Sequence, residues 1–239
     1  MLASNPNYSA ASGALGGDVQ KPLTFLYEVI DFIAAELPRW RDRPDRANEA
    51  AETRLTSQLC GHLNSAARLA AGFDILQFRV EEPDEQDRKR TIDLVPAPCG
   101  FAIVVEGRRY VDLETLLPIE CKRLPTPREN NRDEREYVFS GNSTQGGIQR
   151  FKSGYHGAGH SVGAMIGYVQ ENTTTYWHER TDDWIRGLAA ARSPGWGEDD
   201  LLQLDKYDST LRVAILGSRH KRGTDRTEVE LRHLWLQMN

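Results

Sequence analysis

The sequence has few cysteines, no long apolar run and no excess of basic residues, and each shortage excludes a class of protein. Its three cysteines, Cys60, Cys99 and Cys121, are widely separated and odd in number. A disulfide framework or a zinc ribbon needs paired cysteines, so neither is expected, and a reducing cytoplasm fits best. No apolar run approaches the roughly 18 residues that a membrane-spanning helix needs, so we expect no membrane partner.

The charge balance is mildly acidic, with a formal net charge of −5 at pH 7. Proteins that bind nucleic acid over a broad surface carry an excess of Lys and Arg, so the balance argues against such a surface and leaves only a local basic patch. Hydrophobic residues make up 39% of the chain and charged residues 27%, which is typical of a globular protein. The chain is long enough to bury a large core, and one domain is expected.

The amino-terminal residues are small and polar and lack the basic start and apolar core of a signal peptide. We therefore expect residues 1–20 to form a flexible leader. Residues 21–239 are expected to form the single domain.

Two helices are expected first, over residues 23–37 and 48–70, because apolar residues recur there with helical spacing. Pro38 is expected to end the first helix, and Asn48 is suited to cap the second. Glu52 lies beside the apolar stripe of the second helix. Because an unpaired buried charge is unfavourable, this carboxylate needs a partner, either a nearby arginine or a functional group.

Alternating side chains then indicate strands at four places: residues 73–82, 91–98, 100–113 (a hairpin) and 116–124. Asp93 is isolated among apolar neighbours in the second of these, although Asp is among the poorest strand formers. Glu120 and Lys122 lie two residues apart in the last strand, so their side chains share a face and point to one place. Taken alone, such a pair is usually a solvated surface pair that contributes little.

The order of these residues resembles the PD-(D/E)XK nuclease superfamily. That pattern has an acid on a first helix, an aspartate on a second strand and an acid-x-lysine on a third, here Glu52, Asp93, Glu120 and Lys122. The chain departs from it only in lacking the proline that often precedes the aspartate.

A second segment is similar to members found in bacterial defence and restriction loci. Their "GI-x-RF-x-x-G-x-Y" pattern is matched by Gly147, Ile148, Arg150, Phe151 and Gly154, and Tyr155 lies one residue before the position of its tyrosine. The whole resemblance covers about residues 45–239.

The resemblance implies an α/β, restriction-endonuclease-like fold, with a central mixed β-sheet flanked by helices and a C-terminal antiparallel hairpin over residues 209–223 and 227–238. It also implies a Mg²⁺- or Mn²⁺-dependent endonuclease that cuts DNA in anti-phage defence or restriction, with RNA left open as the target. Non-specific DNA binding depends on Lys and Arg, so an acidic chain is expected to act as a homodimer or with a defence-system partner subunit.

The resemblance also assigns roles within the site. Asp93, Glu120 and the carbonyl of Cys121 would hold the metal, and Glu52 would reach its water ligands or a second metal. Lys122 would act on the attacking water or on the phosphate. The chemistry agrees, because hard Mg²⁺ prefers carboxylate oxygens and a bound metal lowers the pKa of the attacking water.

Three alternatives remain. Glu49 lies one turn before Glu52 and would serve as the helix carboxylate instead. Asp112 also precedes Glu120, but the seven residues between them leave little room for a turn and a fresh strand. A nuclease-like module that binds nucleic acid or a partner protein without cleavage is the alternative function, although a retired site has no reason to keep clustered like charges.

Other polar residues are weaker candidates. Arg150, Lys152 and Gln149 are candidates to contact nucleic acid, with Gln145 as an alternative to Gln149, but a solvated helix face has the same pattern.

The pair His156 and His160 has the spacing of metal ligands on a helix, but the intervening glycines disfavour a helix there. A late polar cluster is expected on an exposed strand, with possible contact to DNA: Ser218, Arg219, His220 and Arg222. The tryptophans expected in the core are Trp177, Trp184 and Trp235.

Overall fold

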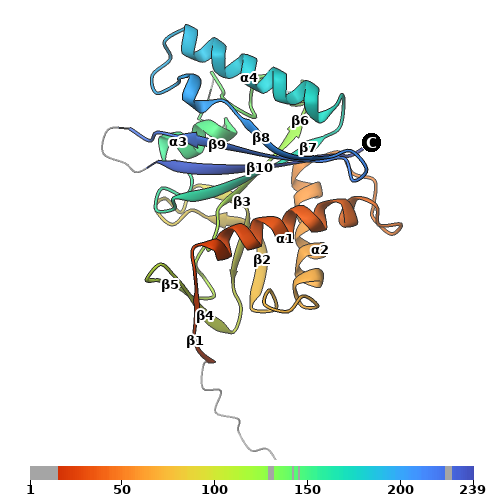
Figure 1. Ribbon diagram of the computed structural model, residues 1–239, viewed down its shortest axis with the longest axis vertical. Coiled ribbons are helices and arrows are strands. Elements are labelled where there is room, and N and C mark those ends of the chain that lie inside the picture. Colours follow the sequence, from red (N-terminus) through yellow and green to blue (C-terminus); the bar gives the residue numbers. More distant parts are fainter. Residues whose placement is uncertain (1–15, 129–131, 142, 145, 224–227) are drawn as a thin grey trace, which may run out of the picture.

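The computed structural model describes residues 16–128, 132–141, 143–144, 146–223 and 228–239. These residues form a mixed seven-stranded sheet, a smaller three-stranded sheet and helices on both faces of the larger sheet (Figure 1). The expected α/β class with a central mixed sheet flanked by helices is therefore confirmed. No helix in this described part of the chain is long and apolar enough to cross a membrane.

The large sheet has the strand order β2-β3-β6-β7-β10-β9-β8. Its strands are β2 (Leu76–Pro83), β3 (Thr91–Pro98), β6 (Ile119–Leu124), β7 (Val162–Val169), β10 (Val229–Gln237), β9 (Val213–His220) and β8 (Gln203–Asp208). β7 pairs in parallel with both β6 and β10, and the other neighbours are antiparallel. The expected C-terminal hairpin is the β9–β10 pair, whereas β8, at the edge of the sheet, was not expected.

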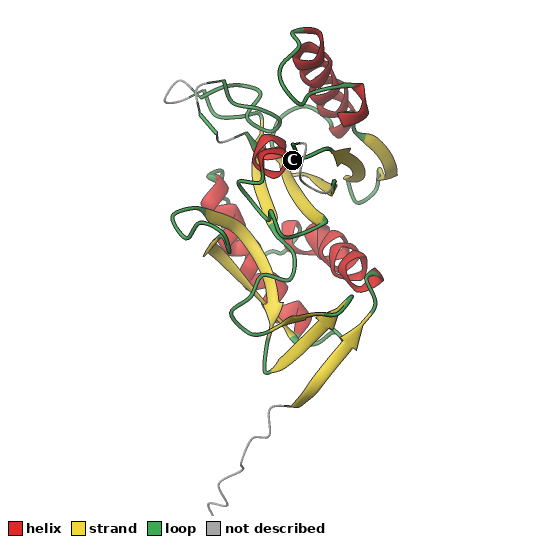
Figure 2. Ribbon diagram, turned by 90° about the vertical axis from the view of Figure 1, so that its left-hand side faces the viewer, coloured by secondary structure: helices red, strands yellow, loops and turns green. Residues whose placement is uncertain are grey.

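The small sheet has the order β1-β4-β5 and lies at one end of the molecule, at the bottom of Figure 2. Its strands are β1 (Gly16–Lys21), β4 (Phe101–Val105) and β5 (Arg108–Tyr110). β1 pairs in parallel with β4, so the prediction that the flexible leader extends to residue 20 is wrong for residues 16–20. Residues 1–15 lie outside the described part of the chain.

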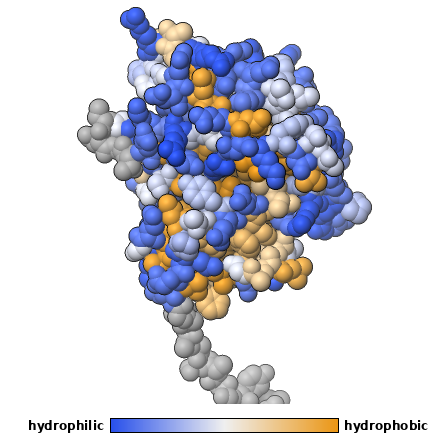
Figure 3. Space-filling view, viewed as in Figure 1, coloured by the Kyte–Doolittle hydropathy of each residue, from blue (hydrophilic) through white to orange (hydrophobic). Residues whose placement is uncertain are grey.

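Helices cover both faces of the large sheet. They are α1 (Thr24–Arg41), α2 (Glu52–Ala67), α3 (Gly147–Ser153) and α4 (Thr174–Ala190). One hydrophobic cluster joins α1 and α2 to the sheet, and a second forms around α3 and α4. Trp177 and Trp184 of α4 and Trp235 of β10 belong to the second cluster, as the sequence predicts. The face in Figure 3 is mostly hydrophilic in its upper half, with more hydrophobic residues in its lower half.

Two helix boundaries differ from the sequence prediction. α1 does not end at Pro38 but continues to Arg41, and its last turn buries Trp40. Pro38 removes only its own N–H, while its carbonyl still accepts the N–H of Asp42, so the last turn remains bonded. α2 begins at Glu52, because Ala51 is extended with ψ 134, and Asn48 therefore does not cap the helix.

Candidate active site

Glu120 and Lys122 lie on β6, between β3 and β7 near the middle of the large sheet. Their side chains meet as the alternation of a strand predicts, with Lys122 Nζ 2.8 Å from Glu120 Oε1. The Glu120 side chain is 0% exposed and that of Lys122 is 6% exposed. The interpretation of this pair as an ordinary solvated surface pair is therefore wrong.

Two further carboxylates converge on the same ammonium group. Glu52, at the start of α2, accepts a hydrogen bond from Lys122 Nζ at 3.3 Å through Oε1. Its Oε2 accepts the backbone N–H of Arg123 at 3.0 Å, which ties α2 to β6. Asp93 Oδ2 lies 3.8 Å from Lys122 Nζ and accepts the N–H of Cys121 at 2.8 Å. Glu52, Asp93 and Glu120, here named the carboxylate ring, thus surround Lys122.

The rival acids lie elsewhere. Glu49 is in the loop that precedes α2. Asp112 is exposed in the loop after β5, where its side chain accepts the N–H of Gly100 at 3.2 Å. The structure therefore brings Glu52 and Asp93, and neither alternative, to Lys122.

Glu120 also meets an arginine and a histidine from the segment around α3. Arg150 Nη1 donates to Glu120 Oε1, and His156 Nδ1 lies 2.9 Å from Oε2. The Glu120 contact of His156 was missed from the sequence, where this histidine was considered only as a ligand together with His160. Gly154 ends α3 in the left-handed conformation, with φ 67, and turns the chain so that His156 reaches β6. His160 instead faces Glu85, at 3.6 Å.

The other residues considered for nucleic-acid contact do not reach this site. Lys152 is buried and pairs with Asp200, on the opposite side of α3 from the ring. Gln149 caps the start of α3, where its Oε1 accepts the N–H of Gly146 at 3.3 Å, and it also accepts the N–H of Ser140 at 3.1 Å. Gln145 lies outside the described residues, so Arg150 is the one of these side chains that the structure places against the ring.

The residues at the ring differ in the direction and cause of their pKa shifts. Burial and the neighbouring Glu120 carboxylate raise the pKa of Asp93 to about 7, against the opposing effect of Lys122. Burial also favours neutral Glu120, but Lys122, His156 and Arg150 outweigh it and hold the pKa of Glu120 well below its usual range. Burial opposes the charge of Lys122, yet the three carboxylates raise its pKa above its usual value. Asp93 is therefore the member whose charge is least compensated.

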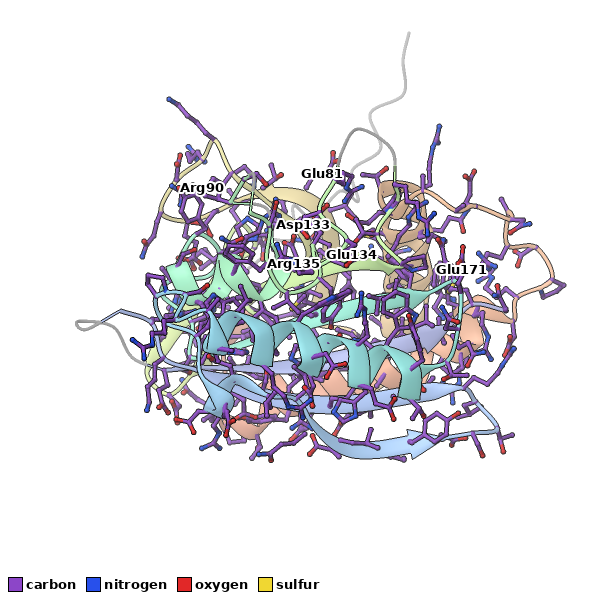
Figure 4. The ribbon with its side chains drawn as sticks, turned by 90° about the horizontal axis from the view of Figure 1, so that it is seen from above. Glu81, Arg90, Asp133, Glu134, Arg135 and Glu171 are labelled. Atoms are coloured by element: carbon purple, nitrogen blue, oxygen red, sulfur yellow. The ribbon has the colours of Figure 1, made fainter. Side chains whose placement is uncertain are left out.

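A cavity of about 230 Å³ opens beside Asp93 and Glu52. Its other lining residues are Thr53, Arg54, Thr56, Ser57, Val80 and Glu81. Glu81, labelled in Figure 4, lies on β2 between Val80, which pairs with Leu94, and Glu82, which pairs with Ile92. Its backbone is left-handed, with φ 53. The cavity is therefore rich in carboxylate and hydroxyl oxygens, the hard donors that Mg²⁺ prefers.

The donor set fits a hard divalent cation, but Lys122 already contacts the oxygens that would bind it. Its Nζ donates to the carbonyl of Cys121 at 3.2 Å as well as contacting the ring. Across the described residues, no three His, Cys, Asp or Glu side chains are arranged as one ready metal site. Ligation by Glu120 Oε1 would therefore require the Lys122–Glu120 contact to lengthen.

The late polar cluster is mostly buried, so its predicted exposure is wrong for Ser218, His220 and Arg222 and right only for Arg219. Ser218 Oγ lies 2.7 Å from both His220 Nε2 and His233 Nε2.

The hydrogen bonds continue at both ends of this cluster, from His220 to Asp200 and from His233 through Tyr137 to Trp235. These polar groups tolerate burial because they satisfy one another.

Comparison with known proteins identifies no relative of this chain. No protein-family model matches it, and no curated protein or solved structure does. A function for the site therefore has to be inferred from its residues and their contacts.

Proposed function

We propose that this chain is a metal-dependent nuclease of the PD-(D/E)XK type that hydrolyses phosphodiester bonds of DNA. The observation that supports it is the convergence of Glu52, Asp93 and Glu120 on Lys122, next to a cavity lined by oxygen donors. Three carboxylates and a lysine at one buried point are unfavourable for stability alone, and such groupings are typical of catalytic sites. The biological setting proposed from the same resemblance is anti-phage defence or restriction.

In this mechanism Asp93, Glu120 and the carbonyl of Cys121 would hold Mg²⁺ or Mn²⁺, with Glu52 beside them. When bound, the metal supplies Lewis acidity and lowers the pKa of the attacking water. Lys122 orients that water or stabilises the charge that develops on the phosphate. Arg150 and His156 keep Glu120 ionised, and therefore able to bind a cation.

The test is a cleavage assay with plasmid DNA, linear DNA and RNA, in Mg²⁺, Mn²⁺, Ca²⁺ or EDTA. We expect cleavage in Mg²⁺ and Mn²⁺, little in Ca²⁺ and none in EDTA, because Ca²⁺ has different coordination. Asp93→Asn and Glu120→Gln should abolish cleavage, whereas Asp112→Asn, an acid outside the site, should retain it. Full activity in either ring variant, or in EDTA, would refute the assignment. Cleavage of RNA but not of DNA would change the proposed substrate from DNA to RNA.

A second function, a module that binds nucleic acid without cleaving it, is favoured by the contacts of Lys122 itself. Its ammonium satisfies the carboxylates without any metal. Lys122→Ala separates the two functions. A catalytic lysine predicts a loss of single-turnover cleavage on the order of a hundredfold with unchanged DNA affinity in Ca²⁺. Equal losses of both, or binding without any cleavage by the wild type, would favour the module.

A further inference from the structure

A second concave surface lies where β6 and β7 end. It is a groove of about 580 Å³, here named the end groove. Its walls come from the segment after β6, the segment after β7 and the first turns of α4, and include Arg123, Arg128, Tyr176 and Arg180. β6 and β7 are parallel, and the carboxyl ends of parallel strands are a common place for ligand binding in α/β proteins.

The end groove adjoins the carboxylate ring through consecutive residues. Lys122 contacts the ring, and the backbone N–H of Arg123 donates to Glu52 Oε2 at 3.0 Å. The Arg123 side chain continues into the groove. The end groove therefore begins one residue along β6 from Lys122, at the carboxyl end of the strand.

Two arginines of the groove have no acidic partner among the described residues. Arg123 donates through Nη1 to the carbonyl of Ala50, while its buried Nε has no hydrogen-bond partner in the part of the chain that the structure describes. Arg128 is exposed. Two carboxylates, both labelled in Figure 4, line the groove. Glu134 pairs with Arg180 at 3.2 Å, and Glu171 forms no ion pair with an arginine of the described residues. Arg128 therefore remains free to bind a phosphate, whereas Arg123 is partly committed to the carbonyl of Ala50.

The first turn of α4 adds favourable electrostatics and an aromatic surface. This helix has 17 residues and no acid in its first turn, so its positive end is not neutralised there. Tyr176 lies in that turn and is 44% exposed. Its ring packs edge-on against Trp177 at 5.2 Å between centroids, which holds it in place.

We propose that the end groove binds unpaired nucleotides next to the scissile phosphate, with one base stacked on Tyr176 and a phosphate on Arg128. Its volume is that of small-ligand pockets, which suits one or two nucleotides and not a duplex. Arginines combined with an exposed aromatic ring are the usual means of binding single strands. This inference rests on the proposed nuclease function and narrows its substrate to DNA with a single-stranded end or flap.

The test measures affinity rather than cleavage, so that it remains informative if the nuclease assignment fails. Fluorescence anisotropy in Ca²⁺ would compare a labelled single strand, a blunt duplex and a duplex with an unpaired overhang. Tyr176→Ala should weaken binding of the single strand and the overhang about tenfold or more, since stacking on one aromatic ring contributes that much. Tyr176→Phe should retain binding. Tyr207→Ala is the matched control, because Tyr207 is 46% exposed on β8, outside the groove.

The arginines are tested by salt dependence. Arg128→Ala should reduce the slope of log affinity against log salt concentration by about 0.7, the value for one phosphate of a single strand. Arg68→Ala, an exposed arginine at the end of α2, should leave the slope unchanged. Unchanged single-strand affinity in Tyr176→Ala, an equal loss in Tyr207→Ala, or the same loss for blunt duplex would overturn the proposal. If Glu120→Gln loses cleavage but keeps its affinity for the single strand, the proposed nucleotide binding in the end groove is supported.

Discussion

Replacing Lys122 by methionine tests the central feature of the site, an ammonium group that neutralises three carboxylates. Methionine keeps most of the side-chain length and removes the charge. Nζ lies 2.8, 3.3 and 3.8 Å from oxygens of Glu120, Glu52 and Asp93, so the substitution leaves all three without their shared cation. Removing one partner of a buried ion pair destabilises by about 3–5 kcal/mol.

The expected loss is at the lower end of that range. Arg150 and His156 remain against Glu120 and still compensate its charge. We therefore expect Lys122→Met to lower the free energy of unfolding by about 3 kcal/mol in EDTA. For a chain of this length that is a decrease in Tm of roughly 6–12 °C.

Added Mg²⁺ should restore part of this stability, because a cation at the ring replaces the missing ammonium. The assay is thermal unfolding of wild type and variant in EDTA and in Mg²⁺. Lys152→Met is the matched control, since Lys152 is also buried and paired with a carboxylate, that of Asp200, but lies away from the ring. We expect it to be destabilised without any extra response to Mg²⁺. An EDTA Tm for Lys122→Met equal to that of the wild type, or a Mg²⁺ response no larger than in Lys152→Met, would refute the reasoning.

Two further predictions concern stability. The pKa of Asp93 is about 7 in the folded chain, above its ordinary value of 3.8. The folded state therefore binds the proton of Asp93 more tightly than the unfolded state does. The stability that this proton contributes is present at low pH and is lost as the pH rises from about 4 to about 7. Asp93→Asn should therefore gain Tm relative to the wild type between about pH 5 and about pH 8 in EDTA, and a relative loss would contradict the raised pKa. Ser218→Ala should destabilise the protein by about 1–3 kcal/mol, because the ring nitrogens of His220 and His233 lose their buried partner, and unchanged urea unfolding would contradict this.

Local geometry marks each residue of the ring as unusual, but only the resemblance to the PD-(D/E)XK pattern grouped Glu52 and Asp93 with Glu120 and Lys122. Strand alternation alone places Glu120 and Lys122 on one face. An isolated aspartate on a strand and an acid beside the apolar stripe of a helix are both locally unfavourable, and this marks Asp93 and Glu52 as residues kept for another reason.

The remaining contacts depend on segments that meet only in three dimensions. Lys152 and Arg150 lie on the same short helix, and no local pattern distinguishes the one that reaches Glu120 from the one that pairs with Asp200. The position of His156 depends on the left-handed turn at Gly154. The Ser218 cluster has the alternation of an exposed strand and is buried because its partners come from distant parts of the chain.

In the proposed nuclease, the charges of the ring would determine where a metal enters. Lys122 and Arg150 both contact Glu120 Oε1, so the most deeply buried carboxylate is compensated already. Asp93, with its raised pKa, borders the cavity and is the least compensated. In the proposed nuclease an incoming cation would meet Asp93 and Glu52 first and would reach Glu120 Oε1 only by displacing the ammonium of Lys122. The same displacement would free Lys122 to act on the attacking water, so metal binding and activation of the lysine would be one event. A Lys122 variant should consequently bind metal at least as well as the wild type while cleaving far more slowly.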